Sequence, residues 1–380
     1  NCDISYASTK QLANAIYSDG ASGKVNNLNT ISNNNIYDFF ISTTATNAIN
    51  LNSFSDNWAI SGNNFYQTTF VPANATNAFT IIKLGANVNG TQILNNYFGG
   101  AASDHSGMLD YGASGQANGS FSIITATSGV GTTTPTSIQG NTISNINISS
   151  NANTTHTLLN LGSGYFNIGT VTGNAFGSST ANDKLNFLSA ANSVSNNALL
   201  IYVYGSNDGD VVNINNNIFG GIKLGYRTGA TTGAASTLDV IKVYSTQTGS
   251  GAGAKLSIDN NQIGFSSAII NNLCNGAVHA IYANTYYTVS YVNPITNNQI
   301  RNINSNGVTY GIRIYNNRLN SNPNYTGQYG YFNISSNTIK DFTSNNNISG
   351  IDATFTELRR SHNYINNNII ANFESTAAST

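Results

Sequence analysis

The sequence predicts an all-β protein that forms a single right-handed parallel β-helix of about 11–13 coils. Three observations lead to this prediction. A six-residue motif recurs from one end of the 380-residue chain to the other. Short segments of alternating apolar and polar residues, which are typical of β-strands, separate its copies. The spacing between copies varies too much for a β-propeller, whose blades each need about 40 residues or more.

The motif reads apolar, any residue, Asn/Gly/Ser, Asn, any residue, apolar. Its copies are ISNNNI (31–36), ISGNNF (60–65), ILNNYF (93–98), IQGNTI (138–143), VTGNAF (171–176), VSNNAL (194–199), INNNIF (214–219), IDNNQI (258–263), ITNNQI (295–300), ISSNTI (334–339) and INNNII (365–370). The fourth position is always asparagine: Asn34, Asn63, Asn96, Asn141, Asn174, Asn197, Asn217, Asn261, Asn298, Asn337 and Asn368.

The two middle positions of the motif predict a tight turn. A sharp bend between strands needs a residue in the left-handed conformation, which glycine and asparagine tolerate best. The third position alternates between these two residue types, as this requirement predicts. The fourth position is never glycine, so its side chain has a task of its own. Because an amide both donates and accepts, we expect the asparagines of successive coils to bond to one another in a ladder along the rod.

The segments between the motifs predict short strands. Examples are AFTIIKL (78–84), LDVIKVY (238–244) and GVTYGIRIY (307–315). The best helical candidate, 8–17, carries a capping-box pattern but resembles 278–285, so we predict a strand there as well. Residues 1–380 are expected to be one domain, with loops inserted near 101–137 and 223–255. The apolar motif positions should stack as columns in the core.

Composition narrows the function classes. Only 8% of the residues are charged and the net charge is −1, whereas nucleic acid would require a basic face. No apolar run reaches the length of a membrane-spanning helix. The 21 Tyr and 17 Phe supply a core, which argues against disorder. Low Lys and Glu content with abundant Thr, Ser and Asn suits an exported protein, so we expect an extracellular or cell-surface location.

The cysteines and the chain ends give two further expectations. Cys2 and Cys274 should lie about 35 Å apart on the rod, whereas a disulfide needs Cα atoms within about 7 Å. Both are therefore predicted to be unpaired. Neither end offers a cap for its open strand edges. We expect either a segment of a longer repeat protein or end-to-end stacking with copies or partners.

The turn asparagines resemble those of right-handed parallel β-helices in the pectate-lyase-like superfamily. The stretches GNTISNINIS (140–149) and NGVTYGIRI (306–314) resemble large Asn/Thr/Gly-rich repeat proteins that Bacteroidota export to the cell surface. This resemblance covers the whole chain and implies an architecture rather than an activity. It also implies type IX secretion and, as partners, surface glycans or other surface and secretion proteins.

No catalytic constellation is evident in the sequence, and no cofactor is assigned. Enzymes of the superfamily that the chain resembles use several carboxylates with a basic residue or a histidine. Asp208 and Asp210 could hold calcium through oxygen ligands, or could be solvated residues of a polar turn. Asp104, His105 and Asp110 could do acid–base work, or could be neighbours by chance. Arg301, Arg313 and Arg318 could form an anion patch or simply keep the surface soluble.

Tyrosines concentrate in the C-terminal third and suggest a glycan-binding surface, because aromatic rings stack on sugar faces. The residues expected to bind are Tyr286, Tyr287, Tyr291, Tyr325 and Tyr329. Half of the tyrosines in this region would belong to the core instead. We therefore expect a non-enzymatic structural or adhesive rod. The alternatives are a polysaccharide lyase or glycoside hydrolase, which a carboxylate cluster beside Arg or Lys would favour, and a phage-type tailspike.

Overall fold

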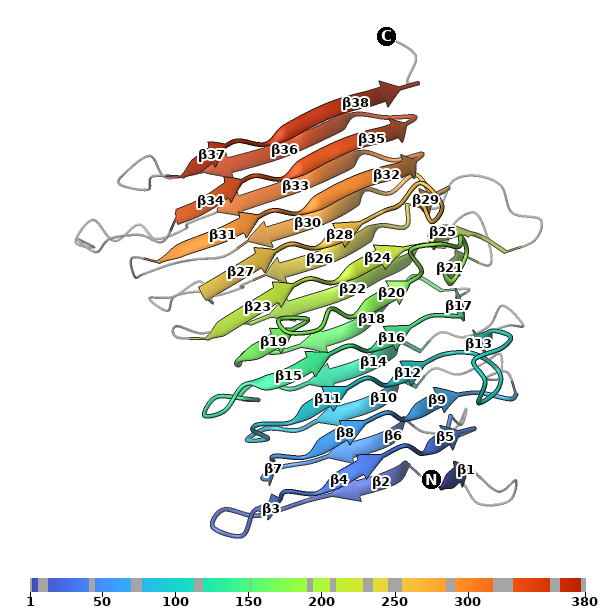
Figure 1. Cartoon of the computed structure of the whole chain (residues 1–380). Coiled ribbons are helices and arrows are strands. Elements are labelled where there is room, and N and C mark those ends of the chain that lie inside the picture. The colour runs from blue at the N-terminus through green and yellow to red at the C-terminus, as the bar shows by residue number, and fades with distance from the viewer. Residues whose placement is uncertain are drawn as a thin grey trace.

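The chain folds into a parallel β-solenoid, as the sequence predicted (Figure 1). The computed structural model describes residues 2–5, 13–40, 45–69, 77–112, 119–150, 152–189, 194–205, 210–227, 235–244, 255–284, 291–316, 331–355 and 363–376. These residues form 38 strands and contain no helix. The coils rise from the N-terminal to the C-terminal end of the rod (Figure 1).

Three long parallel sheets run along the rod, and each coil contributes strands to all three in turn. Sheet 1 has ten strands: β2 (Asn14–Ser18), β6 (Thr46–Leu51), β10 (Phe79–Leu84), β14 (Phe121–Ala126), β18 (Thr154–Leu161), β22 (Asn196–Tyr204), β26 (Leu238–Tyr244), β30 (Val278–Asn284), β33 (Thr309–Asn316) and β36 (Ile348–Phe355). Sheet 2 also has ten: β4 (Thr30–Ser32), β8 (Ala59–Ser61), β11 (Gln92–Leu94), β15 (Thr136–Gln139), β19 (Phe166–Ile168), β23 (Val211–Asn215), β27 (Lys255–Asp259), β31 (Val292–Thr296), β34 (Tyr331–Ser335) and β37 (Tyr364–Asn366).

Sheet 3 follows sheet 2 in every coil and has 16 strands in the described part of the chain. They are β1 (Asp3–Ser5), β5 (Asn35–Tyr37), β9 (Asn64–Tyr66), β12 (Tyr97–Phe98), β13 (Leu109–Tyr111), β16 (Thr142–Ile143), β17 (Ile146–Ser150), β20 (Ala175–Gly177), β21 (Leu185–Ser189), β24 (Ile218–Gly220), β25 (Ile222–Tyr226), β28 (Gln262–Ile263), β29 (Ile270–Asn272), β32 (Gln299–Ser305), β35 (Thr338–Ser344) and β38 (Ile369–Ser375). A separate pair is formed by β3 (Asn26–Asn27) and β7 (Ser55–Asp56). Ten strands in sheets 1 and 2 correspond to ten coils, and β1 adds part of another.

The two ranges expected as inserted loops are only partly loops. Residues 101–137 contain β13 and β14, and residues 223–255 contain most of β25 and all of β26. These strands pair in register with their neighbours in sheets 3 and 1. The alternating apolar residues of these strands fill core positions.

The core is built from stacked apolar columns, as expected. The first motif residue stacks in sheet 2 as Ile31, Ile60, Ile93, Ile138, Ile168, Ile214, Ile258, Ile295 and Ile334. All nine are buried. In the fifth copy the sequence placed Val171 in this column, but Val171 is 86% exposed. Its place is taken by Ile168, because extra residues enlarge this turn and move the asparagine away from the end of the strand.

The turn between sheets 2 and 3 has the predicted left-handed conformation. At nine third-position residues φ lies between 52° and 65°: Asn33, Gly62, Asn95, Gly140, Asn216, Asn260, Asn297, Ser336 and Asn367. A side chain with a Cβ is strained there unless it is asparagine or another small polar residue. This backbone requirement explains why glycine and asparagine exchange at the third motif position.

The fourth-position asparagines form a continuous ladder of ten residues. From Asn34 to Asn337, the backbone N–H and the side-chain Nδ2 of each asparagine both donate to Oδ1 of the asparagine in the next coil, at 2.9–3.1 Å. Nδ2 of each asparagine after Asn34 also donates to the isoleucine carbonyl of the preceding coil, at 2.8–3.1 Å. The ladder thereby satisfies buried backbone groups that the turn removes from the sheets.

Asn197 was predicted to belong to this ladder but does not. Asn174 bonds directly to Asn217, and Asn197 lies in β22 of sheet 1. Its Oδ1 accepts the backbone N–H of Thr237 at 2.9 Å instead. The segment 194–199 matches the motif because the chain is rich in asparagine, but it leads into sheet 1 rather than out of sheet 2. At the N-terminal end, Cys2 pairs with the ladder position and its N–H donates to Asn34 Oδ1.

Candidate functional site: a charged and aromatic face on sheet 1

Most of the residues predicted to bind glycan or calcium lie outside the described part of the chain. This holds for Asp208 and for the tyrosines Tyr286, Tyr287, Tyr325 and Tyr329. Arg318, predicted as part of an anion patch, also lies outside the described residues. Asp210 is buried just before β23, and its backbone carbonyl accepts the N–H of Lys255. Tyr291 precedes β31, with Lys255 Nζ 5.5 Å from its ring centroid. The calcium and glycan assignments to these residues therefore stay predictions.

The predicted acid–base group does not converge. His105 stacks on Tyr97 with ring centroids 3.6 Å apart, and its Nε2 lies 2.9 Å from Asn64 Oδ1. Burial lowers the pKa of His105, an effect that the neighbouring Asp104 charge only partly opposes. Asp104 accepts bonds within its own turn, whereas Asp110 lies on β13 and accepts a side-chain amide from β17. These contacts fasten a loop onto sheet 3.

Two of the three arginines predicted as an anion patch are described, and they lie on different sheets. Arg301 is in β32 of sheet 3, where its guanidinium lies 5.8 Å from the Phe265 ring centroid. Arg313 is in β33 of sheet 1. Cys2 and Cys274 are both free, as predicted, and Cys274 is buried.

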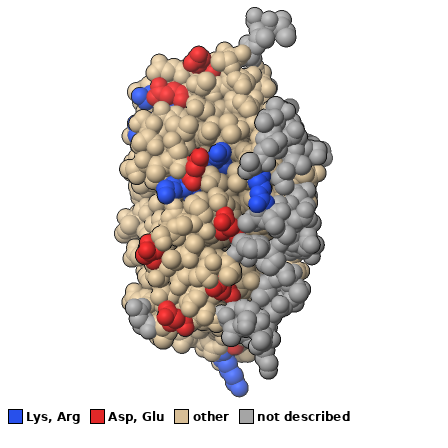
Figure 2. Space-filling model, turned by 90° about the vertical axis from the view of Figure 1, so that its right-hand side faces the viewer, with Lys and Arg blue, Asp and Glu red and all other residues tan. Residues whose placement is uncertain are grey.

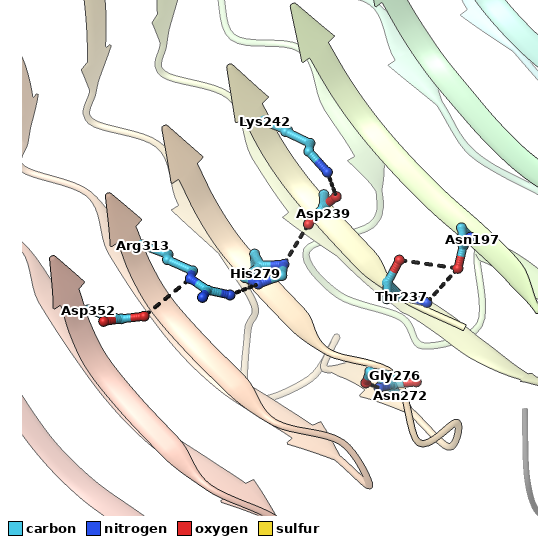
Figure 3. A network of polar contacts seen from close by, with 9 residues as sticks. All are labelled: Asn197, Thr237, Asp239, Lys242, Asn272, Gly276, His279, Arg313 and Asp352. Carbon is cyan, nitrogen blue, oxygen red and sulfur yellow. Dashed lines mark hydrogen bonds and ion pairs between the residues drawn. The ribbon is translucent and has the colours of Figure 1, made fainter. Parts of the chain in front are cut away.

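Arg313 belongs to a chain of polar contacts that crosses four strands of sheet 1 (Figure 3). Asp239 Oδ2 lies 2.6 Å from Lys242 Nζ, and its Oδ1 lies 2.6 Å from His279 Nδ1. On the far side of the imidazole, Arg313 Nη1 lies 3.2 Å from His279 Nε2. Arg313 Nε in turn pairs with Asp352 Oδ2 at 3.2 Å. Five side chains from four strands are thus brought into one row of contacts.

The register of sheet 1 assembles this group. One outward position carries Leu199, Asp239, His279, Tyr310 and Ser349 on successive strands. A second outward position, three residues later, carries Tyr202, Lys242, Tyr282, Arg313 and Asp352. Between them, two consecutive residues point inward, such as Val240 and Ile241, and both are fully buried. The usual alternation is broken there, so residues three apart in a strand share the outer face.

The hydrogen-bond partners of His279 match one tautomer of its ring. An arginine guanidinium can only donate, so Nε2 of His279 is the acceptor in the contact with Arg313. In this tautomer Nδ1 carries the proton and donates to Asp239. Asp239 thereby holds the ring in one tautomer and one orientation.

Asp239 is ionised although it is buried. Burial by itself would raise the pKa of this carboxyl, but the hydrogen bond from His279 and the charge of Lys242 outweigh it and hold the pKa below its ordinary value. Asp352 balances Arg313 in the same way that Asp239 balances Lys242. Lys242 and Arg313 are thus each matched by one carboxylate.

Tyrosine rings surround the charged group. We call this surface, on the outward side of β22, β26, β30, β33 and β36, the tyrosine face; its rings are Tyr202, Tyr204, Tyr244, Tyr282, Tyr310 and Tyr315, all partly exposed. Lys242 Nζ lies 5.9 Å and 5.4 Å from the centroids of Tyr202 and Tyr282. The Arg313 guanidinium lies 4.5 Å from Tyr310. Burial raises the pKa of Tyr202 and of Tyr282, so both phenols stay protonated at neutral pH.

The geometry of the tyrosine face suits ligand contact better than hydrolysis. Paired glycosidase carboxylates stand about 5–9.5 Å apart. Asp239 and Asp352 lie on strands that are three steps apart, which is about 14 Å along the rod. The Asp239–His279 pair resembles the pair that orients a catalytic base, but Nε2 of His279 faces a guanidinium. What the face offers a ligand is a fixed set of phenol, ammonium and guanidinium donors.

Sequence reasoning missed this face although a signal was present. Aligning LDVIKVY (238–244), VHAIYAN (278–284) and TYGIRIY (309–315) on their central isoleucine places Asp239, His279 and Tyr310 at one position. The same alignment places Lys242, Tyr282 and Arg313 at another. Alternation alone hides this correspondence, because it takes no account of the two consecutive inward residues.

Comparison of the chain with protein-family models, with curated proteins and with solved structures yields no match. Within the described ranges, no three His, Cys, Asp or Glu side chains gather as a metal site would require. No helix long and apolar enough to span a membrane occurs in the same residues.

Proposed function

We propose that this protein is an extracellular or cell-surface rod with a structural or adhesive role, which binds glycans through its tyrosine face. The observation that carries the proposal is the register of Tyr202, Lys242, Tyr282 and Arg313 in one outward position of adjacent strands. Binding groups then recur at the coil spacing of about 4.8 Å along the rod. An extended polymer that lies along the rod meets such groups repeatedly.

The chemistry of the face supports a sugar ligand. Sugar hydroxyls pair with phenol, ammonium and guanidinium groups, and aromatic rings shield the apolar faces of the sugar. Because these strands pair in register with one another within sheet 1, the donors are positioned before the ligand arrives. Preorganisation of this kind reduces the entropy lost on binding.

A glycan array tests this proposal. The intact 380-residue chain is compared with Tyr282→Ala, which removes a ring that lies between Lys242 and Arg313. The matched control is Tyr37→Ala, which removes a partly exposed tyrosine from sheet 3, where it stacks on Tyr66. We expect the wild-type and control proteins to bind the same glycans and Tyr282→Ala to lose them. Equal binding by all three proteins, or binding by none, contradicts the proposal.

The Asp239–His279 hydrogen bond is the one observation that favours a polysaccharide-cleaving enzyme on the same scaffold. In that case His279 would act as the base, once Arg313 had moved from its Nε2. Reducing-end and unsaturated-sugar assays on polysaccharides, with and without calcium, separate this alternative from adhesion. Turnover by the wild type that His279→Gln abolishes would establish the enzyme in place of the adhesive rod.

A further inference from the structure

We infer that Asp239 and Asp352 determine ligand charge, so that the tyrosine face takes an uncharged glycan and discriminates against acidic ones. This inference rests on the proposed glycan-binding function and adds a ligand class to it. It starts from the observation that each cation in the charged group of the face is paired with a carboxylate. A carboxylate paired in this way fixes the cationic side chain and also repels a negatively charged ligand.

Lys242 cannot break its ion pair with Asp239 in order to bind the carboxylate of an acidic sugar. Asp239 is only 4% exposed and lies 2.6 Å from both Lys242 Nζ and His279 Nδ1. Taking away one partner of a buried charge leaves that charge uncompensated, which is strongly unfavourable. The ammonium of Lys242 can still donate a hydrogen bond to a sugar hydroxyl while its charge stays balanced.

Arg313 is held in a similar way. Its guanidinium stacks on Tyr310, donates to His279 Nε2 and pairs with Asp352. Five N–H donors are available on an arginine side chain, so hydroxyl groups can be bound without breaking these contacts. A sugar carboxylate at the same place would meet the carboxylate of Asp352, which is 31% exposed and lies 3.2 Å from Nε.

The chain carries no net positive charge that would offset this repulsion. The chain carries 14 basic and 15 acidic residues. On the side of the molecule seen in Figure 2, charged side chains are few, and the two signs are interspersed over a mostly uncharged surface. A polyanion is attracted over distance only by a surface in which one sign predominates. Neutral glycans need no such field.

Calorimetric titration of the intact chain tests the ligand class. The probes are neutral hexasaccharides of glucose, xylose, mannose and galactose, and hexagalacturonate as the acidic probe of equal length. Each titration is run at about 20 mM and about 300 mM NaCl, between which the range of electrostatic interactions shortens severalfold. We expect a neutral hexasaccharide to bind best, with an affinity that salt leaves unchanged. Tighter and salt-sensitive binding of hexagalacturonate would overturn this inference but leave glycan binding intact, whereas binding of no probe would overturn both.

The variant Asp352→Asn tests the residue assignment. Removing this charge should raise the affinity for hexagalacturonate on the order of tenfold at low salt and leave the neutral ligand unaffected. The control Asp341→Asn makes the same change of charge at an ion pair with Lys340 on sheet 3, and should leave both affinities unchanged. Asp352→Ser, which also removes the charge, serves in case the first variant does not fold. Unchanged hexagalacturonate affinity in a folded Asp352 variant would overturn the inference.

Discussion

Replacing Asn298 in the middle of the ladder tests how the rod is held together. In Asn298→Leu the side chain keeps its approximate size but loses its amide. Asn298 Oδ1 accepts the backbone N–H of Asn261 at 3.0 Å, and Nδ2 donates to the carbonyl of Ile258 at 3.0 Å. Both partner groups are buried. The Oδ1 of Asn337 keeps the backbone N–H of residue 298 as a donor, so it is not orphaned.

The expected loss of stability follows from these two orphaned groups. Each buried polar group that loses its partner costs about 1–3 kcal/mol, so Asn298→Leu should lower the free energy of unfolding by roughly 2–6 kcal/mol. The matched control is Asn368→Leu at the C-terminal end of the ladder. Asn368 is partly exposed, so water can replace the lost amide. A loss of about 1 kcal/mol or less is expected for the control, as at other accessible sites.

Urea-induced unfolding of the two variants and the wild type measures this difference. Hydrogen exchange at the Asn261 amide gives a local reading, because stacked coils can open one at a time. We expect faster exchange at Asn261 in Asn298→Leu and no change there in Asn368→Leu. If Asn298→Leu lost no more stability than Asn368→Leu, the ladder would not be what satisfies the turns.

Three further predictions concern stability. His156 is fully buried and burial lowers its pKa to about 3, so only the unfolded chain, with a pKa of about 6.5, takes up a proton as the pH falls below that value. Between pH 7 and pH 5, the free energy of unfolding of the wild type should therefore fall by about 2 kcal/mol more than that of His156→Phe, as measured by urea unfolding. Plots of this free energy against pH that run parallel for the two proteins would contradict the prediction. Asn297 has φ of 56°, so Asn297→Val should lower stability by about 1–2 kcal/mol. Asn297→Gly should be nearly neutral, and equal losses in the two variants would speak against backbone strain. The pKa of Asp239 is held low, so its stabilisation is present above about pH 4 and is lost as the pH falls through the folded value. Thermal unfolding of the wild type should consequently show a steeper decline below about pH 4 than that of Asp239→Asn.

The repeated motif made most of the architecture predictable, because its requirements are local. Each coil needs a turn residue that tolerates the left-handed conformation, and an amide that bonds to its counterpart in the next coil. These two requirements select the same residue types in every coil. The errors arose where composition imitated the motif. Asn197 sits in a matching string of letters, yet it lies in sheet 1. Val171 precedes a ladder asparagine, yet it lies in an enlarged turn and is exposed.

The charged group could not be predicted in the same way, because it depends on alignment between coils. Asp239, His279 and Arg313 come from three coils, and nothing in any single coil marks them as partners. Their proximity follows from the register of sheet 1 and from the two consecutive buried residues that separate its outward positions. Because the coils stack in register, residues at equivalent positions of successive coils lie in a row along the surface of the rod. A search for sites in such proteins should therefore compare equivalent positions of successive coils.

The asparagine ladder gives the rod a polarity along its axis. Each asparagine donates through its N–H and Nδ2 to the coil after it, and its Nδ2 also reaches the carbonyl of the coil before it. The two sides of a coil therefore differ: toward the next coil it presents the N–H and Nδ2 donors of its asparagine, and toward the preceding coil it presents the Oδ1 acceptor.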